Sequence, residues 1–308
     1  MDRPKSREDW QDLTRDGTRS AKLALGTVQF GLSYGIANRA GQVSRSEAKR
    51  MLQLAATNGI DTLDTAIPYG ESEACLGELG VQSFKLVTKL PAVPDGCTAV
   101  SNWVQDQIAA SMARLGVSQL YGLLLHRPEQ LLGPTGRELY QALQGLKDSG
   151  RVQKIGVSIY APSELDKITK LVCLDLVQAP FNLVDRRLHT TGWLQRLKDN
   201  GIEIHTRSVF LQGLLLMPRE AIPTKFAAWS SLWEKWHRWL SEHDASAVRA
   251  CLAFPLGFDE IDRVVVGADS AIQLAKIIEE VSATLSVDVP ELQCDAESLI
   301  NPSRWAAL

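Results

Sequence analysis

The segment Asp64–Gly70 brings a carboxylate and a phenol, Asp64 and Tyr69, onto one short stretch of chain. Residues 59–63 before it combine apolar and β-branched side chains after a glycine, a pattern that favours a strand. Asp64 is therefore expected where this strand ends, and Tyr69 on the loop that follows. In one cavity the phenol could donate a proton, and the carboxylate could hold a cation that tunes the phenol.

Groups that could carry a positive charge end the next two expected strands. Residues 84–89 end in Lys89, and residues 121–126 end in His126. In a parallel barrel such strand ends all open toward one face. Taken singly, these residues are more typical of a buried ion pair, a loop aromatic and a core histidine. Their placement at consecutive strand ends favours a shared catalytic site.

The composition suits a protein with a large core and a small ligand. Of the 308 residues 45% are hydrophobic, and 33 basic against 36 acidic residues leave a net charge of −3. The chain therefore has no excess of positive charge with which to bind nucleic acid or an anionic membrane surface. A small neutral or modestly polar molecule is therefore the expected partner, while the oligomeric state has no signature in the sequence.

The cysteines and the first residues indicate the compartment. The 5 cysteines are scattered and never in a C-x-x-C spacing, which argues against a disulfide framework and a thiolate zinc site. Residues 1–20 form a polar leader without the apolar core of a secretory signal, and no apolar run has the length of a membrane span. We therefore expect a cytoplasmic protein.

Strand and helix patterns alternate eight times, which predicts a single-domain (β/α)8 TIM barrel over residues 21–308, ending in a tail from about residue 282. The strand interiors are nearly continuous apolar runs, as a parallel sheet buried on both faces requires. The expected strands are residues 22–27, 59–63, 84–89, 121–126, 155–158, 174–178, 202–207 and 263–267.

Several helix patterns make specific predictions. Ser44 or Ser46 is expected to cap one helix, and Ser72 and Glu73 to cap another. Beyond Pro162, a helix is expected to turn Leu165, Ile168 and Leu171 inward. A further helix carries Trp229, Trp233, Trp236 and Leu240 at helical spacing, which favours a core face packed on the sheet over a ligand site.

The residues at these strand ends resemble those of the aldo-keto reductase family, and the resemblance extends from Leu25 to Gly267. The matching segments are Asp64–Ala66, Tyr69–Gly70, Ser72–Glu73, Thr88–Lys89, Arg114–Val117, Leu124–His126, Gly150–Val152, Ile155–Ser158, Gln178, Asn182 and Gln212–Gly213.

The family's catalytic Asp, Tyr, Lys and His fall on Asp64, Tyr69, Lys89 and His126. The resemblance implies hydride transfer between a nicotinamide cofactor and a carbonyl or alcohol carbon. Tyr69 would be the general acid and base. A free phenol has a pKa near ~10, so the adjacent Lys89, held by Asp64, would assist proton transfer. His126 would orient the carbonyl oxygen.

The resemblance also implies the cofactor-binding residues. Ser158 and Gln178 match positions that hold the nicotinamide carboxamide, but the Asn that commonly follows the Ser is Ile159 here. Arg207 stands where an aromatic residue usually stacks on the nicotinamide ring. The remaining expected contacts are Gly26 and Thr27 after the first strand, Asp64, the pyrophosphate segment Ser208, Phe210 and Gln212, and Gly267, Asp269 and Gln273 after the last strand.

The resemblance implies that the loop after the last strand would govern the choice between NADP and NAD. Family members that prefer NADP commonly place Lys or Arg there for the 2′-phosphate, whereas this chain has Asp269, and Lys276 and Ile277 replace a common Glu-Asn pair. The helix capped near Ser270 could still take a phosphate at its N-terminus. The sequence therefore predicts NADP as cofactor with NAD also accepted, without a strong preference.

Two other functions compete with the reductase. A regulatory or scaffold barrel that binds cofactor is disfavoured by the retained catalytic residues. A metal-dependent hydrolase is disfavoured because the histidines show no H-x-H or H-E-x-x-H spacing. The substrate is expected to be a small carbonyl compound or a sugar. The residues expected at the mouth of the site are Phe30, Tyr34, Arg127, Glu129 and Phe210.

Overall fold

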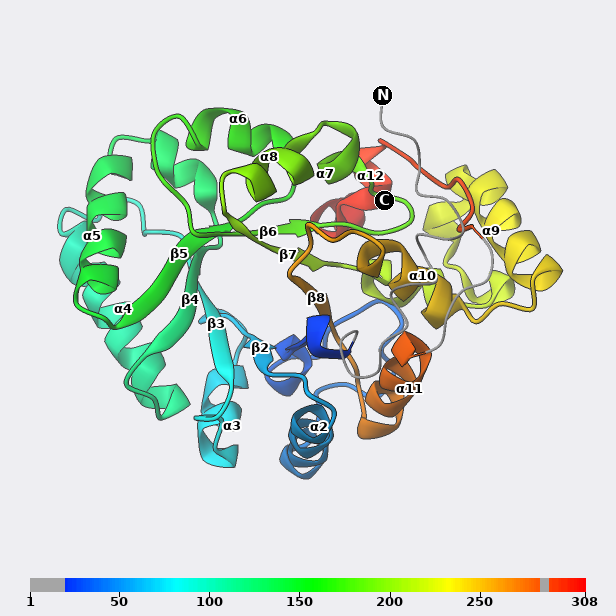
Figure 1. Cartoon of the computed structure of the whole chain (residues 1–308), viewed down its shortest axis with the longest axis horizontal. Helices are drawn as coiled ribbons and strands as arrows, with labels where there is room; N and C mark the ends of the chain where they lie inside the picture. The colour runs from blue at the N-terminus through cyan, green and yellow to red at the C-terminus, as the bar shows by residue number, and fades with distance from the viewer. Residues whose placement is uncertain (1–19, 283–287) are drawn as a thin grey trace.

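The computed structural model describes residues 20–282 and 288–308. Eight parallel strands pair in sequence order and close into a barrel, β1 to β8 (Figure 1), which confirms the predicted single-domain (β/α)8 fold. The polar leader predicted at residues 1–20 lies outside the described residues except for Ser20, so its boundary stays a prediction. The strands are β1 Leu23–Gly26, β2 Thr62–Asp64, β3 Lys85–Leu90, β4 Leu120–Leu125, β5 Val152–Ser158, β6 Leu176–Pro180, β7 Glu203–Arg207 and β8 Arg263–Val266.

Helices connect these strands and cover the outside of the barrel (Figure 1). The α-helices are α2 Arg45–Thr57, α3 Ser72–Leu79, α4 Val100–Leu115, α5 Gly136–Asp148, α6 Leu165–Ile168, α7 Arg187–Thr190, α8 Trp193–Asp199, α9 Ser230–Glu242, α10 Ala247–Leu256, α11 Ala271–Ser282 and α12 Glu297–Ile300. The 3-10 segments are η1 Ser20–Lys22, η2 Val28–Phe30, η3 Pro128–Leu132, η4 Pro162–Glu164, η5 Leu211–Leu216, η6 Arg219–Ala221, η7 Thr224–Trp229 and η8 Pro302–Ala307.

The ends of the helices follow local chemistry. Ser44 caps α2, because its hydroxyl accepts a hydrogen bond from the Glu47 amide at 3.3 Å. Gly116 ends α4 with a φ of 67°, a left-handed conformation that glycine adopts without strain.

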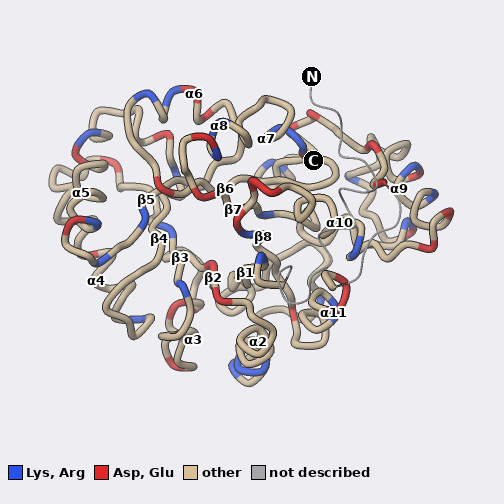
Figure 2. Tube along the Cα trace, viewed as in Figure 1, with Lys and Arg blue, Asp and Glu red and all other residues tan. Residues whose placement is uncertain are grey.

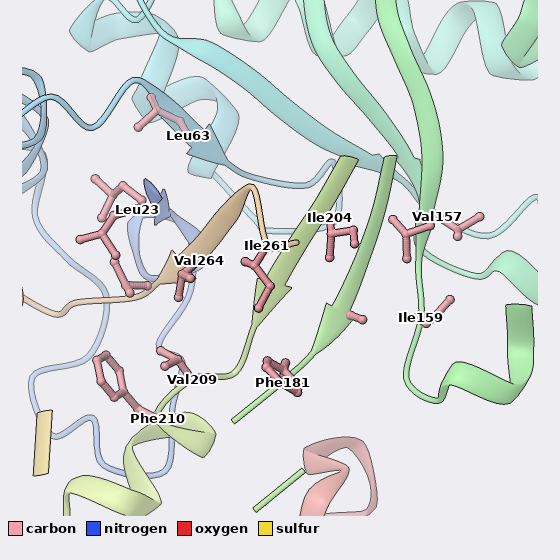
Figure 3. Close-up of a cluster of buried hydrophobic side chains, with 14 of the residues drawn as sticks. Leu23, Leu63, Val157, Ile159, Phe181, Ile204, Val209, Phe210, Ile261 and Val264 are labelled. Atoms are coloured by element: carbon pink, nitrogen blue, oxygen red, sulfur yellow. The ribbon is translucent and has the colours of Figure 1, made fainter. Parts of the chain in front are cut away.

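The core has two parts. Most buried apolar side chains belong to one large cluster, and Figure 3 shows part of it on the strands and on the loops that follow them. A smaller group, Val87, Leu124 and Leu176, forms a separate buried cluster contributed by β3, β4 and β6. Burial on both faces explains the continuous apolar runs of the strands.

Two helix predictions are wrong. Ser72 and Glu73 are the first residues of α3 and make no capping bond there. They are buried instead: Ser72 bonds Thr27 and Thr65, and Glu73 accepts bonds from the α4 side chains Ser111 and Arg114. Such long-range partners cannot be inferred from local spacing.

The inward position predicted for Leu171 is also wrong, because its side chain is 61% exposed. Helix α6 ends at Ile168, so the helical periodicity that buries Leu165 and Ile168 does not extend to Leu171.

The tryptophan-rich helix α9 is a core element, as predicted, but not at the sheet. Trp233, Trp236 and Trp239 are its buried residues, and Trp229 is only its N-cap. In Figure 1 the helix lies at the flank of the molecule, beyond α10 and away from the strands. It packs on η6 and η7, and the Trp236 indole donates to the Leu215 carbonyl at 3.0 Å. It therefore supports the long connection between β7 and β8.

Charges are mixed over the molecule. Figure 2 shows Lys and Arg interspersed with Asp and Glu along the outer helices. Within residues 20–282 and 288–308, no helix is long and apolar enough to cross a membrane.

Candidate active site

The carboxyl ends of β2 and β3 place a buried ion pair. Asp64 is the last residue of β2, and Lys89 is the last but one of β3. The Lys89 ammonium donates to Asp64 Oδ1 at 2.7 Å and to the Thr65 carbonyl at 2.9 Å. Only 1% of Lys89 and 5% of Asp64 is exposed, so solvent screens this pair weakly.

The second oxygen of Asp64 is also engaged. Gln178, in β6, donates its amide nitrogen to Asp64 Oδ2 at 2.7 Å, and the Ser158 hydroxyl lies 3.4 Å from Gln178 Oε1. On the backbone, the amide and hydroxyl of Thr27 both donate to the Asp64 carbonyl, at 2.9 and 3.0 Å. Asp64 is therefore held by Lys89 of β3, Gln178 of β6 and Thr27, the residue after β1.

Tyr69 and His126 face each other beside this pair. Their ring centroids are 6.1 Å apart, in an edge-to-face arrangement. The Lys89 ammonium lies 5.1 Å from the centre of the Tyr69 ring. The structure thus brings together Asp64, Tyr69, Lys89 and His126, which come from three successive strand ends.

The charge states of the two basic residues differ. Burial alone would lower the pKa of Lys89, but the Asp64 carboxylate outweighs burial and raises that pKa above its ordinary value. Burial, assisted by the positive charges of Lys89 and Arg207, lowers the pKa of His126 to about 4. At neutral pH the site therefore contains a lysine cation and an uncharged imidazole.

A cavity of about 920 Å³ opens beside these residues and reaches the start of α11. Lys89 lies beneath its wall, and every other residue predicted as catalytic or cofactor-binding lines it. These are Gly26, Thr27, Asp64, Tyr69, His126, Ser158, Gln178, Arg207, Ser208, Phe210, Gln212, Gly267, Asp269 and Gln273.

Arg207 is held at the end of β7. Its guanidinium carbon lies 4.7 Å from the centre of the Tyr160 ring, and Nη2 donates to the Ile159 carbonyl at 2.9 Å. Among the described residues it has no carboxylate partner within ion-pair distance. Ile159, labelled in Figure 3, is fully buried in the apolar core, so it offers the cavity no polar side chain.

The loop after β7 has an unusual backbone and meets the loop after β1. Ser208, Leu211 and Gln212 have positive φ values of 62°, 48° and 53°, which are costly for residues other than glycine. The Gln212 amide donates to the Tyr34 hydroxyl at 3.0 Å, and a Cβ on Gly213 would lie 2.6 Å from that of Ala37. The two loops therefore close over one side of the cavity.

Some expectations for the mouth of the cavity are wrong. Tyr34 and Phe210 line it, but Phe30 is only 1% exposed and does not. Arg127 and Glu129 lie outside the lining and face each other at 3.7 Å. Because η3 begins at Pro128, the chain beyond His126 turns away from the cavity.

Sequence reasoning missed several lining residues. Gln29, Asn38 and Tyr160 line the cavity. Leu216 and Met217, at the end of η5 and just after it, also line it. The only available signal was the glycine-rich character of residues 28–43, which indicates a loop but not which side chains turn inward.

The described residues form no metal site beside this cavity. Within the described ranges, no group of three or more His, Cys, Asp and Glu side chains is placed to hold a metal ion. The described cysteines are unpaired.

Comparison with known proteins agrees with this architecture. The profile of the aldo/keto reductase family matches residues 22–291. D-threo-aldose 1-dehydrogenase from Pseudomonas sp is 26% identical over 320 aligned residues, which cover 89% of this chain and 97% of that protein. L-glyceraldehyde 3-phosphate reductase from Escherichia coli (strain K12) is 26% identical, over 60% of this chain and 59% of its own length. The holo form of an aldo-keto reductase from Bacillus halodurans superposes with a TM-score of 0.67, at 20% identity, over 85% of this chain and 87% of that one.

Proposed function

The chain belongs to the aldo/keto reductase family and is an oxidoreductase, and from this premise we propose that Tyr69 is the general acid and base of its reaction. The proposed reaction moves a hydride between a nicotinamide dinucleotide and the carbonyl carbon of a small aldehyde or ketone. The observation that carries the proposal is the buried Lys89–Asp64 pair at 2.7 Å, next to Tyr69 at the cavity wall.

Tyr69 would deliver the proton that the reduced carbonyl oxygen requires. As the phenol releases this proton, negative charge develops on its oxygen, and the Lys89 cation beside the ring stabilises that charge. Asp64 and the Thr65 carbonyl hold the ammonium in position, so little reorganisation is needed during the reaction. In the oxidative direction Tyr69 would take the proton back from the alcohol.

His126 would orient the substrate. With a pKa lowered to about 4, its imidazole is neutral at pH 7 and can donate one N–H to the carbonyl oxygen. A neutral donor polarises the carbonyl without adding a second full positive charge beside Lys89. This role also leaves proton transfer to Tyr69.

The residues present suit a nicotinamide dinucleotide, which supplies the hydride when bound. The cavity of about 920 Å³ lies in the upper part of the ~300–1,000 Å³ range of ligand pockets, and it reaches from Tyr69 to α11. Gln29 Oε1 is buried in its lining and has no hydrogen-bond partner among the described residues, so it could accept a bond from a ligand.

The predicted cofactor contacts are retained as part of the proposal. Ser158, Gln178 and Arg207 would hold the nicotinamide end, and Ser208, Phe210 and Gln212 the pyrophosphate. Gly267, Asp269 and Gln273 would receive the adenosine end, while Gly26, Thr27 and Asp64 form the floor. The sequence predicts NADP with NAD accepted; which of the two binds would depend on the residues at the α11 end of the cavity.

For the substrate we favour a hydroxyl-rich carbonyl compound such as an aldose. Tyr34 and Tyr160 line the cavity that contains Tyr69, so phenol hydroxyls are available to bond sugar hydroxyls. The aldose dehydrogenase and the glyceraldehyde phosphate reductase among the relatives support the same class.

The test is turnover of a panel of aldoses, aliphatic aldehydes and ketones with NADH and NADPH, in the wild type and in Tyr69→Phe. Loss of the general acid should reduce kcat by about 10²–10⁴-fold while cofactor binding is retained. Tyr140→Phe is the matched control, because the Tyr140 hydroxyl lies on α5 and bonds the Cys173 carbonyl, outside the cavity.

Full activity in Tyr69→Phe would refute the assignment of the general acid. Cofactor binding without turnover of any carbonyl in the wild type would instead favour the cofactor-binding regulatory or scaffold barrel.

A further inference from the structure

The end of the cavity nearest α11 is lined by hydrogen-bond acceptors. Asp269, between β8 and α11, lines it, and one of its oxygens accepts a bond from Asn38 Nδ2 at 3.3 Å. Gln29 lines the same end, is only 7% exposed, and has its Oε1 buried without a hydrogen-bond partner in the described structure. The Gln29 side chain also hydrogen-bonds Asp269, so of these acceptors only Gln29 Oε1 has no partner among the described residues. A ligand group that donates hydrogen bonds would satisfy it.

The N-terminus of α11, where a phosphate could otherwise bind, is already occupied. The Ala271 amide donates to Glu47 Oε1 at 2.6 Å, and the Gln273 amide donates to the Ser270 hydroxyl at 3.2 Å. The Asp269 amide donates to Gln273 Oε1 at 2.8 Å. The carboxylate of Glu47 therefore takes the place that an anionic ligand would need, contrary to the expectation that this helix could still receive a phosphate.

Positive charge at this end is mostly neutralised. Lys276 lines the cavity, but it pairs with Glu279 and Glu280, each at 3.2 Å. Arg39 also lines the cavity, is exposed, and has no ion-pair partner in the part of the chain that the structure describes. Burial raises the pKa of Asp269, as expected for a carboxylate without a nearby cation.

We propose that this end of the cavity selects NAD(H) over NADP(H), with Asp269 accepting a hydrogen bond from the ribose hydroxyl that NADP replaces by phosphate. The inference rests on the proposed function, since it assumes that a nicotinamide dinucleotide occupies the cavity. It revises the sequence prediction of NADP. A ribose hydroxyl can donate to a carboxylate, whereas a dianionic phosphate is repelled by Asp269 and offers Gln29 Oε1 no donor.

The test is calorimetric titration of the purified full chain with NADH and with NADPH. We expect the wild type to bind NADH at least about tenfold more tightly, because like-charge contacts weaken binding strongly. Asp269→Asn keeps the shape of the side chain and removes its charge, so it should reduce the preference about tenfold or more. Asp148→Asn, on the exposed end of α5, is the matched control and should leave the preference unchanged.

A second variant separates Asp269 from the competing cation. If Arg39 bound the 2′-phosphate, Arg39→Gln would weaken NADPH binding selectively, and we expect no such selective loss. Equal or tighter binding of NADPH by the wild type would overturn the selectivity while leaving the reductase proposal standing. An unchanged preference in Asp269→Asn would overturn the role of Asp269. Binding of neither dinucleotide would overturn the proposed function and this inference together.

Discussion

Replacing Lys89 by methionine tests the centre of the site most directly. Lys89 is 1% exposed, and its loss would leave the Asp64 carboxylate, itself 5% exposed, with Gln178 as its remaining side-chain partner. Removing one member of a buried ion pair costs about 3–5 kcal/mol, because the other charge stays buried and uncompensated. We expect Lys89→Met to lose roughly this much free energy of unfolding.

The same strand supplies a matched control. Lys85, the first residue of β3, pairs with Asp61 at 2.8 Å, but both side chains are 43% exposed. Solvent screens such a pair, so Lys85→Met should cost only about 0–1 kcal/mol. The two substitutions remove the same group from one strand and differ in the burial of the ion pair.

Urea denaturation measures stability, and steady-state turnover of a carbonyl substrate measures catalysis. In catalysis we expect Lys89→Met to lose about 10²–10⁴-fold in kcat, the contribution typical of assisted proton transfer. The double variant Asp64→Asn/Lys89→Met removes the stranded charge as well. It should recover most of the stability and none of the activity, which separates the two effects.

Equal stability and equal turnover of Lys89→Met and Lys85→Met would refute the reasoning. Recovery of turnover in the double variant would show that the single substitution acted by unfolding the site, with no part for the lysine cation in proton transfer.

Two further predictions concern pH and backbone conformation. His126 stays neutral in the fold, with a pKa of about 4, while in the unfolded chain it binds a proton below pH ~6.5. The free energy of unfolding should therefore be full above pH ~6.5 and should fall toward pH 4 by up to roughly 3 kcal/mol, because only the unfolded chain binds the proton in this range. In His126→Gln the free energy of unfolding should depend less on pH between these values than in the wild type. Gly213→Ala adds a Cβ at a φ of 89° that would meet Ala37 Cβ at 2.6 Å, whereas Gly201→Ala, at a φ of 67°, meets nothing within 4 Å. Both variants should lose about 1 kcal/mol of stability from backbone strain. Only Gly213→Ala should also bind the cofactor more weakly in a titration. Equal binding by both variants would contradict the proposed contact between the loops.

The sequence by itself determined the barrel and its central residues. Strand interiors must be apolar on both faces, and this pattern is local, so the alternation of strands and helices could be read directly. The carboxyl ends of parallel strands share one face of a barrel, which brings Asp64, Lys89 and His126 together without knowledge of any side-chain contact. Tyr69 follows because it lies on the loop after the first of these ends.

Only the tertiary structure decided how the rest of the chain meets the cavity. Ser72 and Glu73 have the spacing of a helix cap, yet their partners include Thr27, directly after β1, and Ser111 on α4, both far away in sequence. Helix α9 has a stripe suited to a sheet and supports the loop after β7 instead. Local periodicity specifies that a face is buried, but the surface that buries it depends on the path of the chain.

The selectivity proposed at the α11 end of the cavity illustrates the same limit. The sequence identifies Asp269 as an unusual residue, but its effect depends on whether it faces the cavity and on what else lies there. Three features come from separate elements: Glu47 of α2, whose carboxylate bonds the first amide of α11; Gln29, whose Oε1 has no partner among the described residues; and Lys276 of α11, which pairs with glutamates. Their combined effect on a ligand can be seen only in the folded structure, because electrostatic interactions depend on distance through space and not on distance along the chain.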